Sequence, residues 1–88
     1  PNLLFDEPTI TQNSISGSML SISWDGCQGA SGYRVIYGPS NQRPETLEAS
    51  TRSAELSNLP TGDVSVIVEC SDNLGNSVYS APFIAEVR

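Results

Sequence analysis

The sequence predicts an all-β fold, a sandwich of two antiparallel sheets with about seven strands. No window carries apolar residues at helical spacing over three turns. Alternation of apolar and polar residues recurs instead, and turn-forming residues are spread along the whole chain. The 88 residues are enough for one domain. We expect residues 1–7 to be a linker from a preceding segment and residues 8–88 to form the domain.

The first two strands are expected at residues 9–13 and 19–24. The first follows a proline and is short. The second alternates cleanly, with Leu20, Ile22 and Trp24 on one face and serines on the other. A Ser-Gly-Ser turn separates the two strands. They therefore begin the sandwich with one apolar face.

The third strand, at residues 33–37, turns Tyr33, Val35 and Tyr37 to one face, which leaves Arg34 and Ile36 on the other. The next two apolar stretches, at residues 46–50 and 52–56, alternate weakly. We therefore expect these two to be edge strands.

The sixth strand, at residues 63–71, has the strongest alternation. Its inward positions are Val64, Val66, Val68 and Cys70, and Ile67 falls on the outward side. The last strand is expected at residues 78–87. A proline interrupts it, which favours an edge strand or a bulge.

The charge balance argues against several partners. Ten acidic residues against four arginines, with no lysine or histidine, give a net charge of −6. Nucleic acids and anionic membrane surfaces attract clustered positive charge, so neither is an expected partner. No apolar run is long enough to span a bilayer, and no signal peptide is recognisable.

Catalytic and metal-binding motifs are missing from the sequence. Histidine is absent, and neither a Gly-x-Ser-x-Gly elbow nor a phosphate-binding loop occurs. We therefore expect a non-enzyme without a cofactor. Cys27 and Cys70 are too few for a zinc site of the usual type and do not form a Cys-x-x-Cys motif. The residues alone leave two possibilities for them, two buried thiols or one disulfide.

Several landmarks stand in a specific order. Trp24 ends the second strand, and a small-residue turn leads into "YRVIY". Leu56, Leu59 and Pro60 precede the sixth strand, which runs into "DNLGNSVYSAP". In this order, over roughly residues 8–87, the chain resembles a fibronectin type III domain, which implies an immunoglobulin-like β-sandwich. One departure is Val64, which stands where the family usually has a tyrosine that ties down the preceding corner.

The resemblance implies a role for the cysteines and a core. It places Cys27 in the loop after the second strand and Cys70 at the end of the sixth, at the same pole of the sandwich, so the two are expected to form a disulfide. A disulfide implies an oxidising compartment, and therefore a secreted protein or an ectodomain. The implied core consists of Trp24, Tyr33, Val35, Leu56, Leu59, Val66 and Val68.

Two surfaces compete as binding sites. On the sheet that the resemblance implies, Ile36, Ile67 and Ile84 share an outward face with Arg34 beside them, which would make a small apolar interface. The loop pole instead gathers Asp6, Glu7, Asp25, Asp72 and Asn73. Such oxygens suit calcium, but their spacing matches no calcium-loop motif, so calcium is not expected.

The resemblance and the charge pattern together lead to one expected function. The chain would be a non-catalytic extracellular adhesion or spacer module of a multidomain secreted or cell-surface protein, and would contact a protein partner or neighbouring domains. The alternatives are a ligand-binding module of a cell-surface receptor and an accessory domain of a secreted enzyme.

Overall fold

The computed structural model describes residues 7–27, 30–39 and 42–87, and all regular structure in these ranges is β. None of these residues belongs to a helix that could cross a membrane. The strands are β1 (Thr9–Ser16), β2 (Met19–Asp25), β3 (Gly32–Pro39), β4 (Glu45–Ala49), β5 (Ser53–Leu56), β6 (Gly62–Ser71), β7 (Ser77–Tyr79) and β8 (Phe83–Val87). The all-β prediction is confirmed.

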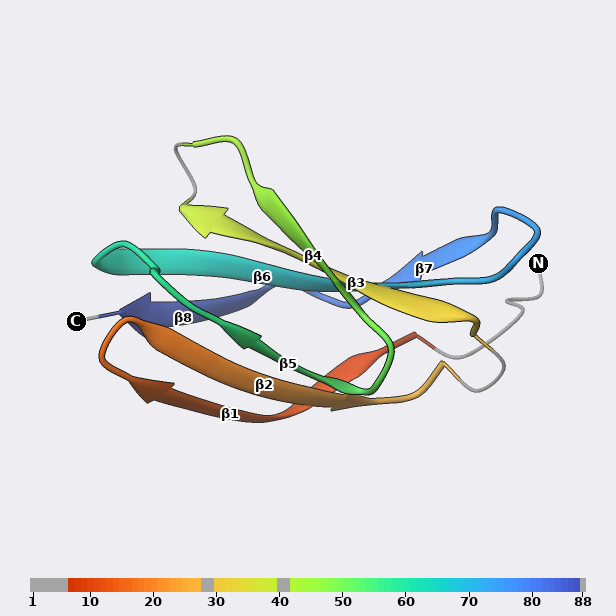
Figure 1. Cartoon of the computed structure of the whole chain (residues 1–88), viewed down its shortest axis with the longest axis horizontal. Coiled ribbons are helices and arrows are strands. Elements are labelled where there is room, and N and C mark those ends of the chain that lie inside the picture. The colour runs from red at the N-terminus through yellow and green to blue at the C-terminus, as the bar shows by residue number, and fades with distance from the viewer. Residues whose placement is uncertain (1–6, 28–29, 40–41, 88) are drawn as a thin grey trace.

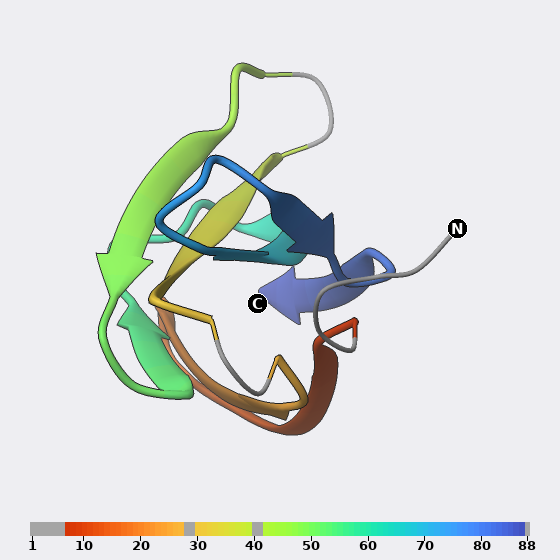
Figure 2. The same ribbon diagram turned by 90° about the vertical axis from the view of Figure 1, so that its right-hand side faces the viewer.

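The strands form two antiparallel sheets. The smaller has the order β1-β2-β5, and the larger has the order β4-β3-β6-β7, with β8 also paired to β6. Figure 1 shows the two sheets as separate layers, and Figure 2 shows them from one end with the interior between them. The expectation that the fourth and fifth strands are edge strands is confirmed, because β4 and β5 each end a sheet.

The core fills the space between the layers. The alternation in β2 and β6 turns one face of each strand inward, because successive side chains of a strand point to opposite sides. The most deeply buried side chains are Trp24, Leu20, Leu56, Val35, Val64, Val66, Val68, Cys27 and Cys70. Leu59 is also buried, and Tyr33 and Tyr37 are partly buried against this cluster.

The structure has eight strands because the expected last strand is divided. The buried residues are Val78 and Ser80 in the first part, which have even numbers, and Ala85 and Val87 in the second part, which have odd numbers. One regular strand cannot turn both sets inward, so the strand is interrupted between them. Ser80 keeps the chain attached to β6 at the break. Its N–H donates to the Val68 carbonyl at 2.8 Å, and its Oγ accepts from the Val68 N–H at 2.9 Å. A proline follows, which cannot donate to a ladder.

The first strand is longer than expected and continues to Ser16. Its register shifts between Ile10 and Gln12, which leaves Thr11 as an extra residue, a β-bulge. All six residues from Thr11 to Ser16 are exposed. A strand exposed on both faces shows no alternation of apolar and polar residues, which explains why the sequence predicts a shorter one.

The corner before β6 is closed without a tyrosine. The backbone N–H of Leu59 donates to the carbonyl of Ser18 at 3.0 Å, and the Leu59 side chain is buried. The preceding residue, Asn58, has a left-handed backbone conformation, with φ of 57°. Asparagine tolerates this conformation better than most residues. An apolar anchor and one backbone hydrogen bond therefore hold the β5–β6 connection against the β1–β2 turn.

Candidate functional site

The outer face of the larger sheet carries a group of isoleucines, which we call the isoleucine patch: Ile36, Ile67 and Ile84. Ile36 and Ile67 lie directly opposite each other on β3 and β6. Both are partly buried, whereas Ile84 is 57% exposed. An isoleucine that is more than half exposed on a paired strand is apolar surface available for contact.

The three isoleucines do not form a straight row across the sheet. Ile84 lies opposite Ser65 on β6, two residues away from Ile67. It is therefore a diagonal neighbour of Ile67, and diagonal positions in an antiparallel pair are about 7–8 Å apart, which long side chains can still bridge. The three isoleucines therefore lie obliquely over β3, β6 and β8.

One end of the patch carries a cation between two acids. Arg34 lies opposite Glu69 on β6 and opposite Glu48 on β4. Its Nη1 is 3.6 Å from the Glu69 Oε1. The Arg34 side chain is 51% exposed and the Glu69 side chain only 11% exposed. The nearly buried carboxylate holds the arginine beside the patch.

Tyr79 extends this polar end onto β7. It lies opposite Glu69, so the same carboxylate faces Arg34 on one side and Tyr79 on the other. The negative charge of Glu69 raises the pKa of the Tyr79 phenol, and a hydrogen bond between the two side chains acts in the same direction. Tyr79 is 51% exposed and adds an aromatic surface next to the aliphatic one.

A depression of about 210 Å³ adjoins the other end of the patch. Its lining includes Gly38 of β3. A Cβ built on Gly38 would lie 3.3 Å from the Cα of Pro44, tighter than an ordinary contact. The depression is lined by Ile36, Tyr37, Gly38, Pro39, Gln42, Pro44, Ser65 and Ile67. The patch is therefore contoured at this end.

The predicted disulfide is present in the structure. Cys27 and Cys70 are joined, with their Cα atoms 6.3 Å apart, and both side chains are buried. Cys27 has a left-handed backbone, with φ of 62°. The preceding Gly26 packs so closely that an added Cβ would lie 2.7 Å from the carbonyl oxygen of Glu7. The bond therefore joins the β2–β3 connection to the end of β6.

In the turn after β6, the carboxylate of Asp72 accepts hydrogen bonds from residues of the same turn. The Asp72 Oδ1 accepts from the N–H groups of Leu74 at 2.8 Å and Asn76 at 3.0 Å, and the Oδ2 accepts from the Asn76 Nδ2 at 3.0 Å. The backbone and side-chain bonds from Asn76 lower the pKa of Asp72. Asp6 lies outside the described residues. Within residues 7–27, 30–39 and 42–87, no three acidic, cysteine or histidine residues are grouped to hold a metal ion.

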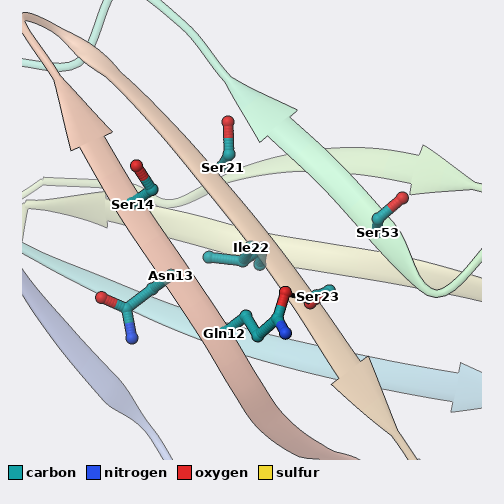
Figure 3. A pocket seen from close by; sticks show the side chains of 7 residues that line it. All are labelled: Gln12, Asn13, Ser14, Ser21, Ile22, Ser23 and Ser53. Atoms are coloured by element: carbon teal, nitrogen blue, oxygen red, sulfur yellow. Dashed lines mark hydrogen bonds between the residues drawn. The ribbon is translucent and has the colours of Figure 1, made fainter.

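The smaller sheet has its own depression, of about 500 Å³ (Figure 3). All of its lining residues are uncharged: Gln12, Asn13, Ser14, Ser21, Ile22, Ser23 and Ser53. The Ser23 Oγ donates a long hydrogen bond of 3.5 Å to the Gln12 Oε1. This lining holds no acid–base pair, and it combines hydroxyls and amides with apolar surface.

The alternation in the sequence predicts that Arg34 and the isoleucines share one face, but the prediction does not include Glu69 and Tyr79. Glu69 is two residues from Ile67 on β6, so the same alternation places it on that outward face. Its pairing with Arg34 depends on the register between β3 and β6, which alternation alone does not specify. Tyr79 could not be assigned while β7 and β8 were read as one strand.

No known protein-family model matches this chain, and no curated protein matches it significantly.

Proposed function

We propose that this chain is an extracellular, non-catalytic adhesion or spacer module of the fibronectin type III kind that binds a protein partner through the isoleucine patch. The single observation that carries the proposal is the pairing of Ile36 with Ile67 on the outer face, extended by the exposed Ile84. Covering such apolar surface is favourable by about 25 cal/mol per Å².

The surroundings of the patch support a protein as partner. Arginine and tyrosine are enriched at the centres of protein interfaces, and Arg34 and Tyr79 stand beside the isoleucines on the same face. Both interact with Glu69, which reduces the side-chain freedom that would be lost when they make a contact. The strands beneath are hydrogen-bonded to one another in one sheet, which suits a preformed surface.

The type of module is supported by its architecture and by its disulfide. Two antiparallel sheets enclose a tryptophan that packs against the tyrosine near the start of β3. The Cys27–Cys70 bond favours an oxidising compartment, and therefore a secreted or cell-surface protein. A ligand-binding module of a receptor is the second candidate, because a shaped depression adjoins the patch.

The test compares three versions of the chain, each presented as a multimer to an array of extracellular proteins. Ile67→Glu puts a charge into the patch, and Asp72→Lys changes the loop pole. The proposal expects binding by the unmodified chain and by Asp72→Lys, and loss of that binding with Ile67→Glu. Unfolding curves must show that Ile67→Glu is folded. Loss with Asp72→Lys alone would instead assign binding to the loop pole.

A further inference from the structure

The outer edge of the smaller sheet is an open β-strand. Among the described residues, β1 pairs with β2 and with no other strand. The bulge at Thr11 interrupts its first part. The following residues, 12–16, pair regularly with β2 and are all exposed. We call this stretch the β1 edge. Its outward N–H and C=O groups are a template for another strand.

Charge distinguishes the β1 edge from the other sheet edges. The chain has a net charge of −6, so two copies repel each other in general. Each of the other edge strands longer than three residues carries at least one carboxylate, which adds to that repulsion. These carboxylates are Glu45 and Glu48 in β4, Glu55 in β5 and Glu86 in β8. No residue of β1 is charged. Among the described strands of this length, β1 is therefore the edge at which two copies meet with the least repulsion.

The side chains of the β1 edge also suit an added strand. Ile15 lies opposite the fully buried Leu20, on the core side of the sheet, yet it is 39% exposed because nothing in the described chain lies beyond it. A further strand would cover it. Gln12, Asn13 and Ser14 carry uncharged amides and a hydroxyl (Figure 3), which can hydrogen-bond to an added strand and do not repel it.

We propose that the β1 edge binds the β1 edge of a second copy of this chain, antiparallel, so that two three-stranded sheets join into one of six strands. The surface is on the opposite sheet from the isoleucine patch, so this pairing goes beyond the proposed function. If the whole stretch of residues 12–16 pairs with itself about a two-fold axis, Ser14 lies opposite the partner's Ser14. Identical residues then meet at the centre of the contact.

The test measures self-association of the 88-residue chain by sedimentation equilibrium over a range of concentrations. Ser14→Glu sets two carboxylates opposite each other, which should raise the dissociation constant of the dimer by at least about tenfold, or about 1.4 kcal/mol. Ser53→Glu is the matched control, because Ser53 is an exposed serine on β5, at the other edge of the same sheet. It should dimerise as the unmodified chain does.

A variant of opposite charge tests the register. It also shows whether Ser14→Glu weakens the dimer through charge repulsion or through damage to the fold. Ser14→Arg alone should also dimerise more weakly than the unmodified chain, but an equal mixture of Ser14→Glu and Ser14→Arg should recover the lost affinity, because opposite charges then meet. An unmodified chain that stays monomeric at about 1 mM would overturn the proposal. So would equal effects of Ser14→Glu and Ser53→Glu, or a mixture that stays monomeric. Dimerisation that Ile67→Glu abolishes would assign self-association to the other sheet.

Discussion

The rings of Trp24 and Tyr33 meet edge to face across the interior, with their centroids 5.6 Å apart and their planes at 68°. Trp24 belongs to the smaller sheet and Tyr33 to the larger, so this contact joins the two layers. Tyr33 is held from outside as well, because the Arg52 Nε donates to its hydroxyl at 3.4 Å. Aromatic pairs of this geometry add to the stability that burial provides.

Replacing Trp24 with alanine should therefore strongly destabilise the fold. We expect Trp24→Ala to lower the free energy of unfolding by about 3–5 kcal/mol, from lost burial and the cavity left behind. Trp24→Phe should cost less, because the indole Nε1 has no hydrogen-bond partner among the described residues and no bond is lost with it. Urea unfolding measures both. A loss below about 1 kcal/mol for alanine would show that Trp24 is not central to the core.

Removing the Cys27–Cys70 bond should destabilise the chain through its unfolded state. The bond joins residues separated by 43 positions, and a loop of this length corresponds to about 4 kcal/mol in the chain-entropy model. We expect a loss of this order for the Cys27→Ala, Cys70→Ala double variant. Intact mass with and without reductant checks the bond itself. Two thiols that react with an alkylating agent in the unreduced protein would contradict it.

The turn at Asp72 should loosen in acid. Its pKa is lowered in the folded chain by hydrogen bonds from Asn76, so its stabilising effect is complete above the ordinary carboxyl pKa and is lost as the pH falls through the lowered value. We expect the amide protons of Leu74 and Asn76 to lose protection as this happens, that is, their exchange rates measured by NMR should approach those of an unstructured peptide at the same pH. In Asp72→Asn the same amides should show no such acid transition. A transition that persists in that variant would assign it to another group.

Glu69 should control the ionisation of Tyr79. Because its charge raises the pKa of the phenol, we expect Glu69→Gln to lower that pKa, observed as an earlier shift of the Tyr79 ring resonances with rising pH. The interaction of the neutral phenol with Glu69 stabilises the folded chain. This stabilisation is complete below the ordinary tyrosine pKa and is lost as the pH rises through the raised value. Glu48→Gln, on the other side of Arg34, is the control. An equal effect of both variants would rule out a specific Glu69–Tyr79 interaction.

The parts of the fold that the sequence predicts well are those with one buried face. In β2 and β6 every second residue is a buried apolar one, from Leu20 to Trp24 and from Val64 to Cys70, so the alternation is visible in the sequence even though Glu69 is buried as well. Most of β1 is exposed on both sides and has no such signal. The division between β7 and β8 escapes detection because a change of parity at Ser80–Pro82 resembles one irregular strand.

The candidate site is predicted in part for a similar reason. Parity puts Ile36 and Ile67 on the outward side, but only the register between β3 and β6 makes them direct partners. The same register brings Arg34 to Glu69, and the pairing of β7 brings Tyr79 to that carboxylate. These are contacts between residues far apart in the chain, and single-strand patterns contain no information about them.

If the proposed function holds, a protein partner binds on the isoleucine patch. The most direct measurement is NMR titration of the isotope-labelled chain with the partner that the array identifies, following each backbone amide. We expect the largest shifts on β3, β6 and β8, at Ile36, Ile67 and Ile84. Largest shifts in the turn at residues 72–76, with the sheet face unchanged, would contradict it.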